Sequence, residues 1–313
     1  MKRTIISLIT MLAASIMAAH AQYYPKKYIE THKYGKVTPA EFDESTYPES
    51  VRDDDVVILE HTDDIILSVD SIYRDAFGGT DQLVKYYNYY RTERYKIKIL
   101  KESGLKYADI KLLHRHIAKP TDHVGFLYGV QGCTYNMKGD KAVDSKLKPR
   151  HVSNRMLDDS TQQISFTMPD VAVGSIIDYE FERKYVSSYP IDKEVILQHD
   201  RPILKSRCIV SMVYLNSKYK VLKEFLSDCY GDIPYRIEKG YYGRYFRTRY
   251  IEAMPESSRD DPFGMRTNLL YRMSSKSDMM VPTITTIYEA ENIPPLSAVT
   301  DPDKVARIRI ILL

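Results

Sequence analysis

The sequence contains no tryptophan, only three cysteines, and no long apolar run beyond its N-terminal region. A membrane-spanning helix needs about 20 consecutive apolar residues, so the rest of the chain is not predicted to cross a membrane. The cysteines, Cys133, Cys208 and Cys229, allow either one disulfide with a spare thiol or three buried thiols. We favour three thiols, because a chain this long can build a core without covalent cross-links.

An excess of one charge sign is also missing. The formal net charge is +3, and two of the positive charges, Lys2 and Arg3, lie in the N-terminal region. This balance argues against a nucleic-acid partner, which requires a clustered basic surface.

Residues 1–21 have the pattern of a secretory signal peptide. Lys2 and Arg3 precede an apolar run from Ile5 to Met17, and Ala19-His20-Ala21 is a small-x-small cleavage site. We expect cleavage before Gln22 and export to the periplasm, the cell surface or the medium. Residues 22–50 are polar, rich in tyrosine and proline and without periodicity, and they are expected to lie on the surface as a leader to a domain over 51–313.

The stretch from Ile164 to Tyr214 is the clearest indicator of fold. Ile177, Tyr179 and Phe181 alternate with acidic residues, the period of a strand with one dry and one wet face. Gly174 provides a position for positive φ in the turn before this strand.

Similar patterns predict strands elsewhere, and helical signals are scarce. Val56–Leu59 and Ile65–Val69 are expected to form a hairpin around the polar residues 61–64. Further strands are predicted at 85–100, 110–117, 126–135, 161–168, 241–252, 281–290 and 307–313, and short helices at 218–227 and 301–306. Together these patterns predict an all-β fold, a large antiparallel β-sandwich of two layers, or an extended super-sandwich, with few short helices.

Several segments resemble a family of unknown function, DUF3857, found in secreted and envelope proteins of Gram-negative bacteria just ahead of a transglutaminase-like domain. The similar segments are DDDVVILEH from Asp53, YKIKILKESG from Tyr95, TYNMKGDKAVDSKLK from Thr134, FTMPDVAVGSIIDYEFE from Phe166, LQHDRPILKS from Leu197 and ENIPPL from Glu291. The resemblance implies a β-sandwich module with a transglutaminase-like domain as partner, in the same chain or in another. The apolar final segment, RIRIILL, is expected to be followed by more protein in relatives.

Catalysis of the transglutaminase type needs a cysteine thiolate, a histidine base and an orienting group, the cysteine usually at a helix N-terminus. Cys133 and Cys208 lie in predicted strands and Cys229 precedes a turn. We therefore expect no catalytic residues and no cofactor in this chain.

Weak candidates for a metal site are His114, His116 and His123. Residues 114 and 116 share one face of a strand, and imidazole is a common zinc ligand. Two surface histidines and one loop histidine explain the pattern equally simply, because no carboxylate or cysteine is spaced to complete a site.

Tyrosine is the unusual component, with 27 residues against 8 phenylalanines. Tyr87 and Tyr90 in one run, and Tyr242 and Tyr245 with Arg247 in another, are candidate contacts for a surface peptide or a glycan. Tyrosine is also a good residue for packing half-buried strands. The leading hypothesis is a non-catalytic interaction or scaffolding module; the alternatives are a tyrosine-lined binding module and a metal-dependent hydrolase at the histidine cluster.

Overall fold

The computed structural model describes residues 37–75, 81–115, 123–158, 161–187, 189–213, 225–246 and 279–312. The chain divides into two units. The larger comprises Tyr34–Met212, Asn216–Glu238 and Thr286–Leu313, and the smaller comprises Met1–Lys33, Val213–Leu215 and Lys239–Thr285. Of the smaller unit, the described residues are the last residue of one strand and parts of two others, so the account below concerns the larger unit.

The described residues are almost entirely strands joined by turns. The strands are β1 (Val56–Asp75), β2 (Asp81–Ile99), β3 (Asp109–Arg115), β4 (His123–Lys138), β5 (Lys141–Lys146), β6 (Ser153–Asp158), β7 (Thr161–Thr167), β8 (Ile176–Ser187), β9 (Ile191–Ile196), β10 (Ile203–Val213), β11 (Phe225–Tyr230), β12 (Arg236–Phe246), β13 (Met279–Ile293) and β14 (Arg307–Leu312). Short 3-10 helices occur at η2 (Pro39–Phe42), η3 (Glu44–Thr46), η4 (Glu49–Val51), η5 (Glu102–Ala108), η6 (Pro149–His151), η9 (Leu296–Ala298) and η10 (Pro302–Lys304). In the described part of the chain no helix is long and apolar enough to span a membrane.

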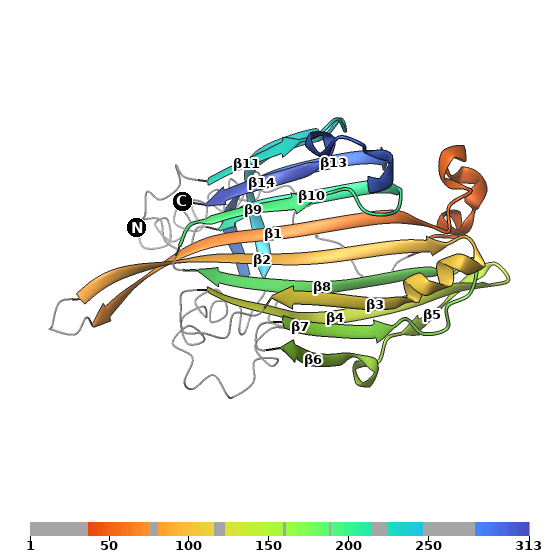
Figure 1. Ribbon diagram of the computed structural model, residues 1–313, viewed down its shortest axis with the longest axis horizontal. Coiled ribbons are helices and arrows are strands. Elements are labelled where there is room, and N and C mark those ends of the chain that lie inside the picture. Colours follow the sequence, from red (N-terminus) through yellow and green to blue (C-terminus); the bar gives the residue numbers. More distant parts are fainter. Residues whose placement is uncertain are drawn as a thin grey trace, which may run out of the picture. The chain divides into compact units, whose positions relative to one another are not determined.

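The strands form one large sheet and two small ones (Figure 1). The large sheet has eight strands in the order β12-β13-β10-β1-β2-β8-β4-β5, and the small sheets are β11-β14-β9 and β3-β7-β6. The neighbours β1, β2, β8, β4 and β5 pair antiparallel, whereas β1 and β10 run parallel. The predicted all-β class and the dominance of antiparallel pairing are confirmed.

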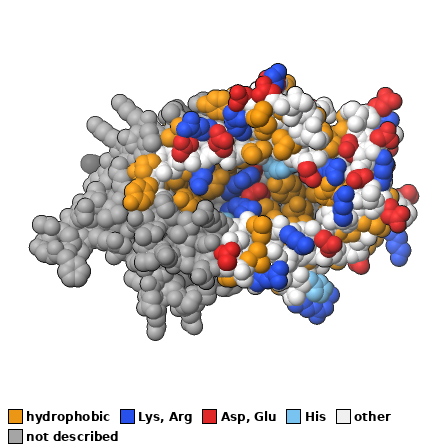
Figure 2. Space-filling view, viewed as in Figure 1, with side chains coloured by type: hydrophobic (Ala, Val, Ile, Leu, Met, Phe, Trp, Pro, Cys, Tyr) orange, Lys and Arg blue, Asp and Glu red, His pale blue; other side chains and the backbone are white. Residues whose placement is uncertain are grey.

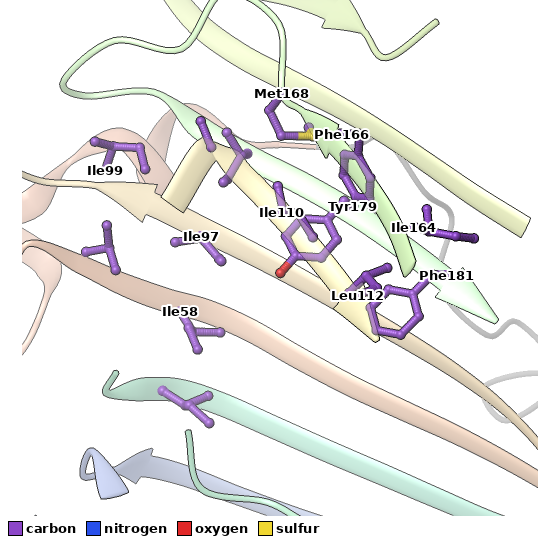
Figure 3. Close-up of a cluster of buried hydrophobic side chains, with 14 of the residues drawn as sticks. Ile58, Ile97, Ile99, Ile110, Leu112, Ile164, Phe166, Met168, Tyr179 and Phe181 are labelled. Atoms are coloured by element: carbon purple, nitrogen blue, oxygen red, sulfur yellow. The ribbon is translucent and has the colours of Figure 1, made fainter. Parts of the chain in front are cut away.

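Both small sheets pack on the same face of the large sheet, which we call the inner face. Ile110, Leu112, Ile164 and Phe166 of the sheet β3-β7-β6 form one apolar cluster with the large sheet (Figure 3). Ile191, Val195, Ile308, Ile310 and Leu312 of the sheet β11-β14-β9 form a second cluster, with Ile65, Leu67, Tyr87, Tyr89 and Val210 of the large sheet. The sandwich therefore has two apolar cores side by side instead of one.

The hairpin expected within 56–69 is wrong. β1 runs unbroken through residues 61–64 and pairs with β2 along its whole length. The four polar residues 61–64 continue the strand and do not form a turn. His61 and Asp63 point to the inner face, and their neighbours point to the opposite face. A β-bulge between Ile58 and Glu60 shifts the alternation, which places His61 on the same face as Ile58.

The end of the expected leader is packed against the domain. Residues 39–51 form three 3-10 helices (Figure 1, red). Tyr47 and Val51 are buried against Val57, Leu59 and Ile176 on the face of the large sheet opposite the inner face, which we call the outer face. The segment is also tied by charge, since Lys96 Nζ of β2 lies 2.7 Å from Glu41 Oε1.

Two other expectations differ from the structure. The helix expected at 301–306 is the short 3-10 helix η10, capped by Asp301. Of the helix expected at 218–227, residues 225–227 belong to strand β11, and 218–224 lie outside the described residues. Strands β5 and β6 were not predicted, because their side chains are almost all exposed and the segments lack a buried alternating stripe.

Candidate functional site: charged residues on the inner face

The apolar inner face is interrupted at its centre by charged residues. On β2, Arg91 and Glu93 occupy inward positions between Tyr89 and Tyr95. On β1, His61 and Asp63 face them, and on β8 Arg183 follows Phe181 on the same side. We call His61, Asp63, Arg91, Glu93, Arg183 and His199 the inner-face cluster.

The acids and the guanidinium groups alternate in a chain of ion pairs. Asp63 Oδ1 accepts a hydrogen bond of 2.7 Å from Arg91 Nε. Arg91 Nη2 lies 3.4 Å from Glu93 Oε2, and Arg183 Nε donates to Glu93 Oε1 at 2.8 Å. The Asp63 side chain is fully buried and that of Glu93 is 6% exposed, so the arginines compensate the burial of both carboxyl groups.

Arg183 links the cluster to the small sheet above it. Its Nη1 donates to the backbone oxygen of Leu113 at 2.9 Å and lies 3.4 Å from His114 Nδ1. Its guanidinium also lies over the ring of Phe181 at 5.1 Å. His114, a metal candidate from the sequence, therefore belongs to the edge of this cluster.

The two histidines of the cluster contact each other. The rings of His61 and His199 lie edge to face with centroids 4.5 Å apart, and the ring of Tyr95 is 4.7 Å from that of His61. Tyr95 in turn stacks on Tyr179, with centroids 5.3 Å apart. An aromatic row thus joins the histidines to the apolar core.

Several polar atoms of the cluster have no hydrogen-bond partner among the residues that the structure describes. They are Nδ1 and Nε2 of His61, Oδ2 of Asp63 and Nε2 of His199, all buried. His61 Nε2 lies 3.6 Å from Asp63 Oδ2, which is longer than a hydrogen bond. Buried polar atoms in folded proteins are nearly always paired, so this concentration marks an unusual place in the fold.

Burial and neighbouring charges set the protonation of the cluster. Burial lowers the pKa of His61 well below its usual range, and His199 and Arg91 lower it further. Burial also lowers the pKa of His199. The pKa of Arg91 is raised by Asp63 and Glu93 despite its burial. At neutral pH the two imidazoles are therefore uncharged.

A hollow lies on this face between the two small sheets. Figure 2 shows it lined by basic, acidic and histidine side chains over a floor of hydrophobic ones. The side chains of Arg183 and Arg91 are 24% and 16% exposed, and His199 is half-buried. The cluster is thus reached by solvent at its edge, while His61 and Asp63 lie beneath.

The arrangement offers hydrogen-bonding groups of both kinds. Each arginine is engaged by a carboxylate, and the neutral imidazoles offer one donor and one acceptor each. Among the described residues no group of three or more histidine, cysteine or acidic side chains is arranged to hold a metal ion.

All three cysteines are free thiols. Burial raises the pKa of Cys133 and raises that of Cys208 well above its usual range, where Asp63 adds to the effect. Burial raises the pKa of Cys229 to about 12. The favoured prediction of free thiols over a disulfide agrees with this geometry, although Cys229 is only half-buried.

Of the tyrosine candidates, the structure describes the side chains of Tyr87 and Tyr90, which point to opposite faces of β2. Tyr87 is 5% exposed and packs in the core with Ile65 and Leu67, so it is not available as a surface contact. Tyr90 points to the opposite face of β2, where Lys184 Nζ lies 5.5 Å from its ring centre. Tyr242 and Tyr245 lie on β12, with side chains outside the described set, and Arg247 is outside the described residues.

The remaining metal candidates are not tested by the structure. His116 lies outside the described residues, and His123 begins β4 with a side chain that is not described.

The inner-face cluster was not recognised in the sequence, although its signal is there. Arg91 and Glu93 occupy positions of the same parity as Tyr87, Tyr89, Tyr95 and Ile97, so they had to point into the core. His61 and Asp63 were assigned to a turn, which hid their inward direction. A charged pair at inward positions of a strand pattern is the clue that identifies this kind of site.

Comparison with known families supports the resemblance found in the sequence. Residues 86–224 match the family model of DUF3857, a domain of unknown function with a solved structure. This segment is similar to the DUF3857 family. Within the cluster, Arg91, Glu93, Arg183 and His199 lie in the DUF3857 segment, whereas His61 and Asp63 precede it on β1. The site thus joins the family segment to the strand before it.

The structure also resembles a crystal structure of a "putative protease" from Parabacteroides distasonis ATCC 8503. The similarity has a TM-score of 0.49 with 8% sequence identity, and it covers 83% of this chain and 40% of that one. The chain therefore spans less than half of the length of this structure. No curated protein matches the sequence.

Proposed function

We propose that this chain is a secreted, non-catalytic β-sandwich module that serves in interaction or scaffolding, beside a transglutaminase-like domain in the same chain or in another. The observation that supports the proposal is the state of its reactive groups. Burial raises the pKa of every cysteine, and the charged groups of the inner-face cluster neutralise one another. A thiol nucleophile requires a lowered pKa and a base beside it, which is the opposite arrangement.

The interaction role has its own support in the hollow of the inner face. Binding sites are concave, largely apolar and carry a few placed polar groups. The hollow in Figure 2 has a floor of hydrophobic side chains with charged ones around it. Arg91 and Arg183, whose side chains point to this face, are 16% and 24% exposed. A domain built for structure alone gains nothing from charged residues at the centre of its core, since well-packed apolar residues are often as stable.

The test is an activity measurement on the purified chain from Gln22 onward. Peptide hydrolysis is followed with a mixture of fluorogenic peptides, and transamidation is followed by incorporation of a labelled amine into casein. We expect neither activity, in the wild type or in the variant with Cys133, Cys208 and Cys229 all replaced by serine. Turnover that the triple substitution abolishes would refute the non-catalytic role.

The partner and the localisation need separate experiments. An in-frame coding sequence after the Leu313 codon that contains a Cys, His and Asp set would support a transglutaminase-like domain in the same chain; a stop codon there, together with no such protein co-purifying from the native host, would oppose it. Export is tested by fractionating cells that produce the chain with and without residues 1–21. We expect the chain made with residues 1–21 to reach the exported fraction and to be cut there before Gln22. The chain made without these residues should be missing from that fraction.

A further inference from the structure

The starting observation is a set of buried polar atoms with no protein partner. His61 is fully buried and neither ring nitrogen makes a hydrogen bond, and Oδ2 of the fully buried Asp63 is also unpaired. Two of these three atoms lie close together, because His61 Nε2 is 3.6 Å from Asp63 Oδ2. They offer one imidazole N–H donor, one imidazole acceptor and one carboxylate acceptor.

The position of His199 provides a way in. Its backbone is held, because its carbonyl oxygen accepts from Leu296 N and the neighbouring Gln198 bonds to Ala306 N and Pro294 O. Nε2 of its side chain has no hydrogen-bond partner among the described residues, and its ring rests edge to face on His61. Rotation of this half-buried side chain would uncover His61 and Asp63 without moving the backbone.

We propose that the inner-face cluster is a binding site for the carboxamide group of a peptide, the side chain of a glutamine or asparagine, and that the ring of His199 is the gate above it. One carboxamide N–H donates to Asp63 Oδ2, and the carboxamide oxygen accepts from the N–H of His61 Nε2, the two protein atoms that lie 3.6 Å apart. This inference rests on the proposed function, because it takes the chain to be a binding module. It adds the position of the binding site and the class of ligand.

The charge of the site favours an uncharged ligand. Asp63 and Glu93 are ion-paired with Arg91 and Arg183. The unpaired oxygen of Asp63 would therefore repel a carboxylate ligand, and both guanidinium groups that could attract it are already bonded to carboxylates. An ammonium group would lie beside Arg91, which is bonded to the same carboxylate. A neutral group that both donates and accepts fits the unpaired atoms without a charge penalty.

The aromatic rings favour a peptide over a sugar. Sugar sites offer an open aromatic face, and the aromatic ring beside the cluster is that of the half-buried Tyr95. That ring is stacked on Tyr179 at 5.3 Å, tilted against His61 at 4.7 Å and in edge contact with His199 at 5.3 Å. With its faces engaged, Tyr95 has no platform for a pyranose, whereas a side-chain amide needs none.

The experiment follows the histidine ring nitrogens by NMR in the full chain labelled with 15N-histidine. The probe is a capped glycine-serine peptide with one central glutamine. The comparison probes are the same peptide with glutamate at that position and a neutral oligosaccharide, maltohexaose. We expect saturable shifts of the His61 and His199 signals with the glutamine peptide only. No shift of these signals at millimolar peptide, or equal shifts with glutamate or sugar, would overturn the proposal.

Variants separate binding from folding. His61→Phe keeps a ring of similar shape and removes both unpaired nitrogens, so we expect loss of peptide binding together with a higher urea midpoint. A variant that is less stable than the wild type, or that still binds, contradicts a ligand-binding role for His61. The matched control is His151→Phe, the same change at an exposed position of η6, which should alter neither property.

His199→Ala tests the gate. Removal of the ring should leave binding intact and lower the peptide concentration needed for half-saturation. Loss of binding in this variant would refute the gate. These outcomes are distinct from those of the proposed function. Turnover of peptides by a chain that binds the glutamine peptide would overturn the non-catalytic role alone. A chain that shows no activity and does not bind the glutamine peptide would overturn this inference alone.

Discussion

At the scale of single residues, two bidentate ion pairs between arginine and aspartate show how burial differs for the same contact. Arg94 and Asp178 on the outer face form two parallel hydrogen bonds of 2.8 and 2.6 Å, and both side chains are nearly inaccessible. Arg309 and Asp192 form the same geometry, 3.0 and 2.6 Å, on strands β14 and β9 with about half of each side chain exposed. The chain therefore contains a matched pair of bidentate contacts that differ mainly in burial.

This pair makes a direct prediction. Asp178→Ala leaves the guanidinium of Arg94 buried without a partner and should lower the free energy of unfolding by about 3–5 kcal/mol. Asp192→Ala removes an exposed partner and should have little measurable effect. Urea unfolding followed by circular dichroism measures both. Equal losses in the two variants would show that burial does not decide the cost here.

The buried histidines predict a loss of stability in acid. The folded-state pKa values of His61 and His199 are lowered from 6.5, mainly by burial. Below about pH 6.5 the unfolded chain then binds more protons than the folded one, so the free energy of unfolding falls with decreasing pH. The charged or titratable groups near His61 are Asp63, Arg91, Glu93, Tyr95, His199 and Cys208.

The measurement is the urea midpoint between about pH 7 and pH 5, a window above the usual range of carboxylate titration. His61→Phe should show a shallower decline than the wild type, because one of the two buried imidazoles is gone. His151→Phe, at an exposed site, should follow the wild-type curve. If the urea midpoint of His61→Phe declines with pH as steeply as that of the wild type, His61 is not a source of the loss of stability in acid.

At the scale of elements, the turns fix where the long strands begin and end. The 3-10 helix η5 follows β2 and presses against the start of β1. Gly104 in this helix is buried, and a Cβ there would meet the carbonyl oxygen of Asp55 and lie 2.8 Å from Val56 Cγ1. The nearest atom belongs to the backbone of another element, so it cannot move aside as a flexible side chain would.

Gly104→Ala should therefore lower the free energy of unfolding by about 1–3 kcal/mol, the usual cost of overpacking. The neighbouring change Ser103→Ala removes an exposed hydrogen bond to Asp55 Oδ1 and should cost less. Thermal unfolding of both variants distinguishes the two effects. A Gly104→Ala protein as stable as the wild type would show that η5 can shift away from β1.

At the scale of the larger unit, residues 37–51 are part of the packed domain. Tyr47 is 5% exposed in the outer-face cluster, and its hydroxyl donates to the carbonyl oxygen of Glu41 within the same segment. Lys98, 2% exposed on β2, donates to Gly174 O at 2.8 Å and lies 3.4 Å from Glu44 Oε1. The segment thus covers both apolar and charged parts of the outer face.

Tyr47→Ala tests the contribution of this segment. Removal of a buried aromatic ring should cost about 3–5 kcal/mol of unfolding free energy, because a cavity remains against Val57 and Ile176. Tyr189→Ala, at a residue that is 57% exposed, is the control and should change stability little. Equal midpoints in urea for the two variants would show that 37–51 is not part of the cooperative unit.

The sequence by itself determined the class of the fold and most of its strands. Alternation such as Ile177, Tyr179 and Phe181 is a local property with a period of two, and it appears wherever one face of a strand is dry. The family resemblance came from the same local segments. These features need no knowledge of which strands become neighbours.

Only the tertiary structure decided the candidate site. Arg91 and Glu93 come from β2, Arg183 from β8, His61 and Asp63 from β1, and His199 from the segment between β9 and β10. Their proximity depends on strand register, on the bulge before Glu60, and on two small sheets that cover the ends of one face and leave its centre open. Such contacts join residues that are far apart in the chain, and a pattern that repeats every two residues carries no information about them.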